Sequence, residues 1–167
     1  ILSDDREQTI LHTLHPEFDG ASYKGDGANN VGQLSQSTDE STNRNYYSWL
    51  STRPTMQDYD VIVVYTLPED FVRWDDGLTF TFRSAVSDAS QNKLDLQVFD
   101  TSGAQVTLSG SSVNLTSTTW RSQHIEFNGS PTWTAGQKMM IRMKLHSKDN
   151  NFMQLGEVQL QYVELNQ

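Results

Sequence analysis

Two arms in the C-terminal stretch of the chain, residues 137–165, alternate apolar with polar side chains. The apolar positions are Met139, Ile141, Met143 and Leu145 in the first arm, and Val158, Leu160 and Tyr162 in the second. Successive side chains of a β-strand point to opposite faces, so each arm offers one apolar and one polar face. This pattern predicts half-buried antiparallel strands. The short polar break between the arms predicts either a hairpin or a crossing between two packed sheets.

Earlier segments continue this pattern. Residues 59–67 are β-branched and apolar on both faces, which is typical of a strand that is covered on both sides. Residues 78–83 alternate after Asp76-Gly77, a pair that favours a turn. Residues 68–74 have room for at most one short helical turn. About eight to ten short strands with regular turn signals predict an all-β fold, an antiparallel sandwich or a barrel.

The length of 167 residues predicts a single domain over residues 1–167, with a loose N-terminal segment at about residues 1–8. The first residue is Ile1, which is expected for a processed product or for a segment of a longer protein.

The sequence contains no cysteine, so disulfides, thiolate metal sites and cysteine nucleophiles are excluded.

The charge of the chain is acidic, with 21 Asp and Glu against 12 Lys and Arg and a net charge of −9. Nucleic acids and anionic membrane surfaces attract the opposite charge, so neither is expected as a partner. No apolar run approaches the roughly 18 residues of a membrane span. The abundance of Ser, Thr, Asn and Gln is typical of an extracellular, cell-surface or virion β-domain.

Residue patterns that support catalysis are missing from the sequence. There is no Gly-x-Ser-x-Gly nucleophile motif. The histidines, at positions 12, 15, 124 and 146, are not spaced to bring three ligands to one metal ion. Glu126 and Glu157 occupy positions where any sheet would place polar residues. The sequence therefore predicts that the protein is not an enzyme and has no cofactor, with calcium as the one possible ion.

The possible calcium ligands lie in a loop-like segment that is rich in glycine, aspartate and asparagine. Asp19, Asp26 and Asn29 supply the oxygen atoms that calcium prefers, although their spacing is not that of an EF-hand. Ordinary turn chemistry explains the same residues equally well.

Aromatic side chains offer a second kind of site. Trp and Tyr rings bind the apolar face of a sugar, while its hydroxyls need hydrogen-bond partners. Large aromatic residues are also common in cores, and both interpretations stay open. Tyr23 and Trp120 are available, and the favoured ligand-binding residues are Tyr46, Tyr47, Trp49, Trp74 and Trp133.

Four features of the C-terminal part, over residues 113–162, resemble a jelly-roll β-sandwich. They are the segment Leu115-Thr-Ser-Thr-Thr-Trp120, the segment Trp133-Thr-Ala-Gly136, the alternating arm 139–145, and the segment Leu155-Gly-Glu-Val-Gln-Leu160. Domains that look like this occur as carbohydrate-binding modules and as fibre, spike or decoration domains of phage particles and bacterial surfaces. The resemblance implies an antiparallel two-sheet sandwich of jelly-roll type. The residues with which carbohydrate-binding modules bind calcium and sugar have no counterpart in these segments.

Two functions follow as hypotheses. The first is a non-enzymatic structural or assembly domain of an extracellular or virion surface structure, such as a fibre, decoration or filament subunit. Its partners would be other copies of the chain, in a homo-oligomer, or a larger surface assembly. The alternative is a carbohydrate-binding module that uses exposed Trp and Tyr residues to bind a glycan, with calcium as a stabilising ion.

Overall fold

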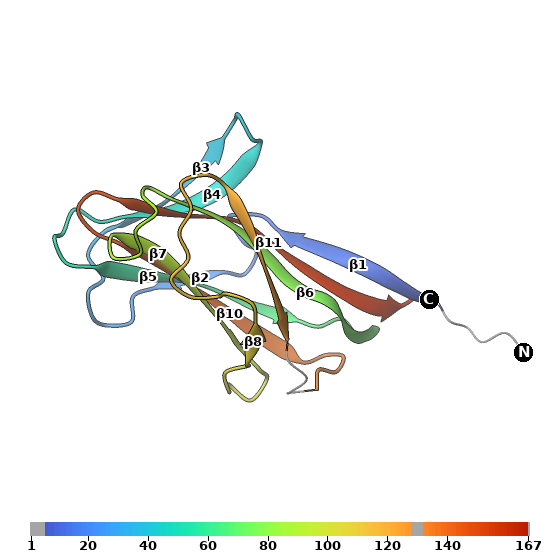
Figure 1. The fold of residues 1–167 in the computed structure, drawn as a ribbon. Helices are drawn as coiled ribbons and strands as arrows, with labels where there is room; N and C mark the ends of the chain where they lie inside the picture. Colours follow the sequence, from blue (N-terminus) through green and yellow to red (C-terminus); the bar gives the residue numbers. More distant parts are fainter. Residues whose placement is uncertain (1–5, 128–131, 167) are drawn as a thin grey trace, which may run out of the picture.

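The computed structural model describes residues 6–127 and 132–166 of the chain. Within these residues, eleven strands form two antiparallel sheets that pack face to face (Figure 1). The predicted all-β, two-sheet sandwich of jelly-roll type is confirmed. The described residues contain no helix, and therefore none that could cross a membrane.

The larger sheet is organised around the longest C-terminal strand, β11 (Phe152–Leu165). In order across the sheet, its strands are β3 (Gln33–Asp39), β4 (Arg44–Leu50), β11, β6 (Phe71–Ser84), β9 (Arg121–Phe127) and β8 (Leu108–Ser109). A further strand, β1 (Glu7–Leu14), also pairs with β11. On one side β11 pairs with β6; on the other, its first residues pair with β4 and residues 158–165 pair with β1.

The smaller sheet contains the first of the two alternating arms. In order, its strands are β2 (Ser22–Lys24), β5 (Gln57–Thr66), β10 (Lys138–Ser147) and β7 (Asn92–Phe99). Strands β10 and β11 thus follow each other in the chain but belong to different sheets. The polar break between them crosses from one sheet to the other, which decides between the two possibilities that the sequence left open.

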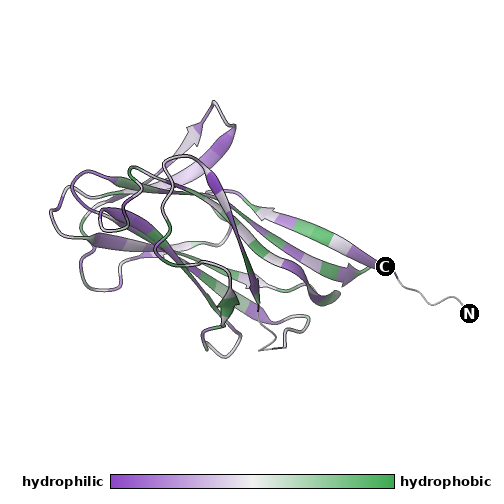
Figure 2. Ribbon diagram, viewed as in Figure 1, coloured by the Kyte–Doolittle hydropathy of each residue, from purple (hydrophilic) through white to green (hydrophobic). Residues whose placement is uncertain are grey.

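The core lies between the inner faces of the two sheets. The apolar side chains of both arms point into it, and the hydropathy alternates accordingly along the strands (Figure 2). Each fully buried side chain of this size stabilises the fold by roughly 1.5–3 kcal/mol. The arm residues with no exposed area are Met139, Ile141, Met143, Leu145, Val158 and Leu160.

A β-bulge in β11 shifts the inward-facing positions by one residue. Leu155 pairs with Phe82 and Val158 pairs with Phe80, so β11 contains one residue more than β6 over this interval. The extra residue lets Leu155 and Val158 both face the core. It also leaves Glu157 on the outer face, where its carboxylate accepts a hydrogen bond of 3.0 Å from Nε of Arg44.

A second bulge occupies the position where the sequence predicted a turn. That prediction was wrong, because β6 continues through Asp76-Gly77 without a break. Trp74 and Gly77 pair with adjacent residues of β11, so Asp75 and Asp76 are inserted between them. Gly77 has a φ of 67°, and the same left-handed conformation serves turns and bulges. Local sequence alone does not distinguish the two.

Three other predictions differ in detail from the structure. Residues 68–70 form a non-helical turn in which the Phe71 N–H donates to the Pro68 carbonyl, and β6 begins at Phe71. In the segment predicted to be loose, β1 already begins at Glu7, while residues 1–5 lie outside the described residues. The eleven strands in the described part of the chain exceed the predicted number partly because β2 and β3 form in the glycine-rich and polar region.

The bulge at Gly77 generates a stability prediction. A Cβ at Gly77 would collide with the carbonyl oxygen of Ile125, and the positive φ strains any other residue by about 1–3 kcal/mol. Gly103 also has a positive φ, of 85°, but has nothing within 4 Å of the added Cβ. In urea unfolding we expect Gly77→Ala to destabilise the protein by at least ~1 kcal/mol more than Gly103→Ala. Equal losses in the free energy of unfolding of the two variants would show that the close approach of β6 and β9 does not contribute to stability.

Candidate functional site

An aromatic cleft opens at the edge of the sandwich, where β2 and β5 of the smaller sheet approach β3 and β4 of the larger one. Its volume is about 330 Å³. It combines apolar walls with polar groups near the opening, as small-ligand sites do. The lining residues are Tyr23, Gly32, Leu34, Gln36, Trp49 and Tyr59.

One wall consists of two stacked rings. The ring centroids of Trp49 and Tyr59 lie 5.1 Å apart with an interplanar angle of 20°. The Trp49 indole N–H donates to the carbonyl oxygen of Gln57 at 3.0 Å, which fixes the orientation of the ring. Trp49 is 1% exposed, whereas Tyr59 is half-buried, so Tyr59 presents more of this stack to a ligand.

Tyr23 forms another wall and is 37% exposed. Its hydroxyl lies 2.8 Å from the hydroxyl of buried Tyr47, which in turn accepts a hydrogen bond from the backbone N–H of Phe18. Burial, together with the hydrogen bond to Tyr23, raises the pKa of Tyr47 far above its usual range, so its hydroxyl stays protonated. This neutral hydrogen-bonded chain holds the Tyr23 ring at the cleft.

Strand β3 and the residue before it complete the cleft. A Cβ at Gly32 would come within 2.7 Å of the Trp49 ring and 2.8 Å of the Leu50 carbonyl oxygen, so this close approach requires glycine. Leu34 adds an apolar surface, and the amide of exposed Gln36 offers both a donor and an acceptor.

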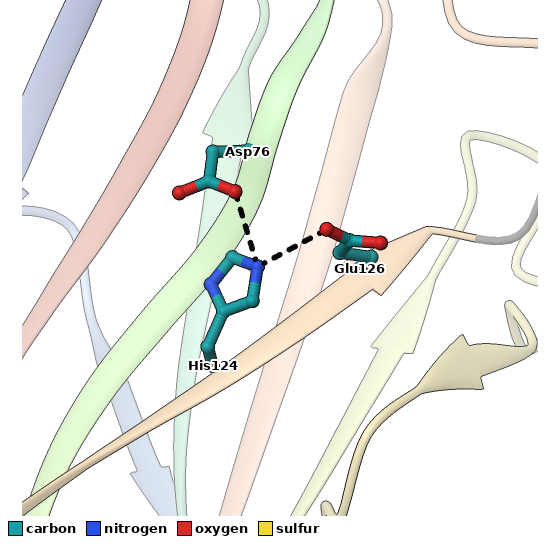
Figure 3. A group of neighbouring side chains, drawn as sticks. All are labelled: Asp76, His124 and Glu126. Carbon is teal, nitrogen blue, oxygen red and sulfur yellow. Dashed lines mark ion pairs between the residues drawn. The ribbon is translucent and has the colours of Figure 1, made fainter.

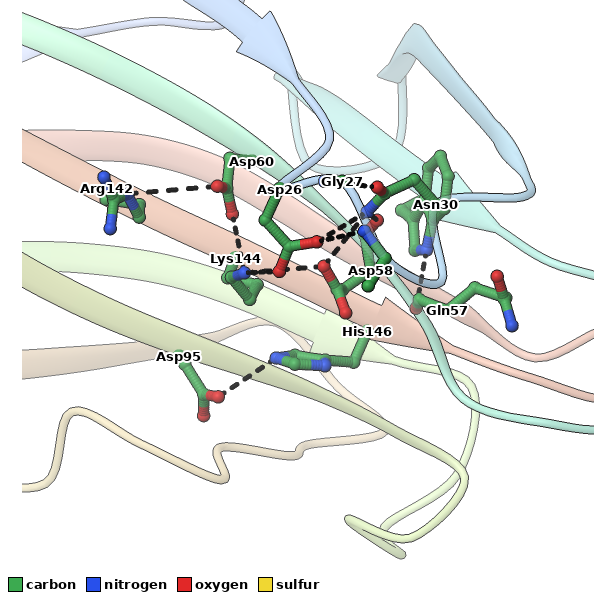
Figure 4. A network of polar contacts seen from close by, with 12 residues as sticks. Asp26, Gly27, Asn30, Gln57, Asp58, Asp60, Asp95, Arg142, Lys144 and His146 are labelled. Atoms are coloured by element: carbon green, nitrogen blue, oxygen red, sulfur yellow. Dashed lines mark hydrogen bonds and ion pairs between the residues drawn. The ribbon is translucent and has the colours of Figure 1, made fainter.

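A polar network lies on β5 and β10, on either side of Tyr59 in the sequence (Figure 4). The Lys144 ammonium lies 2.6 Å from Oδ2 of Asp26, 3.4 Å from Oδ1 of Asp58 and 3.6 Å from Oδ1 of Asp60. One cation thus serves three carboxylates, two of which belong to the strand that carries Tyr59. The network ties the loop after β2 to the smaller sheet.

The charges in the network have different environments. The hydrogen bond from Lys144, followed by those from Ala28 and Asn30, lowers the pKa of Asp26 well below its usual range. Burial raises the pKa of Asp58, although the charge of Lys144 acts in the opposite direction. The backbone reinforces the connection, since the Asp58 N–H donates to the Asn29 carbonyl at 2.8 Å.

At the far end of the same face, the network continues to β7. His146 Nε2 lies 3.0 Å from Oδ2 of Asp95, and the Arg142 guanidinium lies over the Phe99 ring at 4.9 Å. These contacts join β10 to β7, so side-chain contacts between neighbouring strands cross the polar outer face of the smaller sheet.

The structure separates the five aromatic residues that the sequence favoured as ligands. Tyr47 and Trp49 are buried beside the cleft, and their positions make them supports of Tyr23 and Tyr59 rather than exposed platforms. Tyr46 lies on the opposite side of β4, 5.5 Å from the Trp120 ring. The guanidinium groups of Arg44 and Arg83 each lie 4.9 Å from that Trp120 ring.

Trp74 and Trp133 come together at another place in the core. Their rings make an edge-to-face contact at 6.2 Å, and Trp74 also contacts Phe71 at 5.5 Å. Trp133 is only 8% exposed. These contacts are those of core residues, so the core interpretation suits this pair better than a ligand platform.

The residues favoured for calcium are also separated. Asp26 binds the Lys144 ammonium, and Asn29 has a φ of 60° and uses its carbonyl in the loop. Asp19 lines a different hollow, next to β1 and β5. The calcium prediction for Asp19, Asp26 and Asn29 receives no support from this arrangement.

Sequence reasoning missed Tyr59 and Gln36 as members of a site. Tyr59 begins the apolar segment 59–67 and was assigned to a strand, while Gln36 lies in a polar stretch without a visible pattern. The pairing of β3 with β4 places Gln36 beside the cleft, and the stacking of the Tyr59 ring on Trp49 between the two sheets brings Tyr59 to it. Nothing in the sequence around Gln36 or Tyr59 indicates that the two residues lie close together.

Comparisons with known proteins identify similar folds. No family model and no curated protein matches the chain. Among solved structures, an arabinose-bound GH51 α-L-arabinofuranosidase is 8% identical with a TM-score of 0.51, and the match covers 84% of this chain but 23% of that one. This likeness shows the fold alone.

Two carbohydrate-binding modules are also similar at lower scores. A family 61 module solved in complex with β-1,4-galactotriose is 11% identical, with a TM-score of 0.45 and coverage of 93% of this chain and 88% of that one. The family 11 module of the cellulosomal cellulase Lic26A-Cel5E of Clostridium thermocellum is 11% identical, with a TM-score of 0.40 and coverage of 96% and 88%.

The polar network generates a stability prediction. Lys144→Met leaves Asp26, Asp58 and Asp60 without their shared cation, and we expect a loss of about 1–3 kcal/mol at pH 7, since the pairs are partly solvated. The loss should shrink as the pH falls from about 6 to about 2. Asp58, whose pKa burial raises, binds a proton first, and Asp26, whose pKa is low, binds one last, so the variant then no longer lacks a counter-charge for them.

Urea unfolding of both proteins across this pH range checks the expectation. The matched control is Lys138→Met, because Lys138 lies on the same strand but is exposed. A pH-independent loss for Lys144→Met would contradict the electrostatic explanation and indicate lost packing.

Proposed function

We propose that the protein is a non-catalytic glycan-binding domain that binds its ligand in the aromatic cleft. The observation that carries this proposal is the convergence of Tyr23, Tyr59 and Trp49 from three strands on one opening of about 330 Å³. Ligand sites commonly occupy about 300–1,000 Å³, so the opening is large enough for a small part of a glycan chain.

The chemistry of the cleft suits a neutral sugar. Its aromatic rings match the apolar C–H face of a pyranose, while the Gln36 amide and the Tyr23 hydroxyl are placed to bind sugar hydroxyls. The rings need little rearrangement on binding, because the hydrogen bonds of Trp49 to Gln57 and of Tyr23 to Tyr47 already orient them. Such preorganisation lowers the entropic cost of binding.

The polar network favours binding over catalysis. Glycoside hydrolysis needs a pair of carboxyl groups, one as acid and the other as base or nucleophile. Here Asp26 and Asp58 face a common lysine ammonium and serve to hold the loop on β5. A glycan-binding domain of this kind would act at the cell surface or outside the cell, where polysaccharides are found.

Variants at the opening provide the test. On a glycan array, and then by calorimetry with the best neutral oligosaccharide, we expect Tyr23→Ala and Gln36→Ala each to weaken binding by about tenfold, as loss of one ring contact or hydrogen bond implies. Tyr46→Ala is the matched control, since this half-buried tyrosine faces the other side of β4.

Equal losses in all three variants, or binding that Tyr23→Ala and Gln36→Ala leave intact, would exclude the cleft as the site. A folded protein without any glycan signal would exclude the function. Circular dichroism of each variant establishes that the fold is retained.

A structural assembly domain is the second candidate function, and an exposed apolar edge favours it. Leu11 of β1 is 57% exposed. Val64 of β5 is 52% exposed and lines a hollow of about 470 Å³, together with His12 and Leu14 of β1. An edge of this kind can pair with another copy of the chain or with a surface scaffold. The role would be excluded if the protein sediments only as a monomer at high concentration and no partner is recovered with it from its native source.

A further inference from the structure

Three side chains of types that can bind metal ions converge on the outer face of the larger sheet (Figure 3). Asp76 comes from β6, and His124 and Glu126 come from β9. His124 Nε2 lies 3.3 Å from Oδ1 of Asp76 and 3.5 Å from Oε1 of Glu126. All the candidate ligand atoms lie within 4.8 Å of one another.

Strand alternation in β9 and the bulge in β6 together explain the convergence. Buried Ile125 lies between His124 and Glu126, so strand alternation directs both of these side chains to the outer face. The bulge makes Asp76 one of two extra residues in β6 between Trp74 and Gly77. Gly77 permits the backbone of β6 to approach Ile125 of β9 closely. The carboxylate of Asp76 thereby faces the imidazole.

The imidazole atom at the centre of the cluster lacks a hydrogen bond. Among the described residues, His124 Nε2 has no hydrogen-bond partner, and it is inaccessible to water. Its distances of 3.3 and 3.5 Å to the carboxylates exceed the usual N–H···O range of about 2.7–3.2 Å. Two ligands bound tetrahedrally to zinc at about 2.0–2.2 Å lie about 3.3–3.6 Å apart, which these distances match.

The other ring nitrogen has a partner that can fix the tautomer. His124 Nδ1 lies 3.1 Å from Oγ1 of Thr79, the residue directly opposite on β6. When Nδ1–H donates to this hydroxyl, Nε2 presents a lone pair between two carboxylates. A cation at that point relieves the repulsion, and an outer hydrogen bond of this kind is usual for histidine ligands.

We propose that Asp76, His124 and Glu126 bind one divalent transition-metal ion of the zinc type. The two carboxylates match the charge of the ion, and the imidazole favours zinc over calcium, which prefers oxygen ligands. Three protein ligands leave a fourth position for water or for an atom of a bound partner. The ion would link β6 to β9 across the bulge.

Calorimetric titration of ZnCl₂ into chelator-treated, tag-free protein tests the site. We expect one zinc ion per chain and no comparable heat with CaCl₂. His124→Gln and Asp76→Asn remove ligands and should each weaken binding at least tenfold. Thr79→Val removes only the outer hydrogen bond and should weaken binding roughly 10- to 100-fold. The matched control is His15→Gln, since His15 is exposed and outside the cluster.

Nuclear magnetic resonance of the wild-type protein gives a readout that does not depend on variants. Saturating zinc should shift the imidazole nitrogen resonances of His124 and leave those of His15 unchanged. Zinc binding that is equal in His124→Gln and the wild type, or an unshifted His124 ring at saturation, would overturn the proposal. The second result would show that zinc binds elsewhere on the protein.

Discussion

The fold depends on the burial of the inner faces of β10 and β11. These strands occupy the middle of the two sheets, and their apolar side chains meet in the core with almost no exposed area. Because every second residue on each strand must face inward, a shift of one residue would expose a complete set of apolar side chains. The pairing of β5 and β7 with β10, and of β6, β4 and β1 with β11, follows from that register.

Departures from strict alternation then create the features that have chemical interest. The bulge after Leu155 restores the inward direction of Val158 and releases Glu157 to bind Arg44. The bulge at Gly77 brings Asp76 to His124. In both places an irregularity re-aims a carboxylate while the strands on either side keep their core contacts. The proposed zinc site is therefore a consequence of how β6 accommodates two extra residues.

The proposed glycan site has a different origin, in the open edge between the sheets. There the short strand β2 and the strand β3 leave the rings of Tyr23 and Tyr59 accessible, while Trp49 and Tyr47 beneath them are held by hydrogen bonds. The Lys144 network holds the adjoining loop on the smaller sheet through charges of opposite sign. The two proposed sites use different residues on different strands of the sandwich, so each can be altered without the other.

The sequence by itself determined the all-β class. It also determined which residues of the two alternating C-terminal arms point into the core, because alternation is a local property of successive residues. It also correctly placed residues 59–66 in a strand, but Val64 is 52% exposed, so the prediction that this strand is covered on both sides was wrong. The sequence did not distinguish a turn from a bulge at Asp76-Gly77, since both use a left-handed glycine. Nor did it assemble Tyr23 with Tyr59, or Asp76 with His124, which lie 36 and 48 positions apart in the chain. Strand order and register, which tertiary packing decides, bring these residues together, and for the same reason the tertiary structure assigned Tyr47, Trp49 and Trp133 to buried positions.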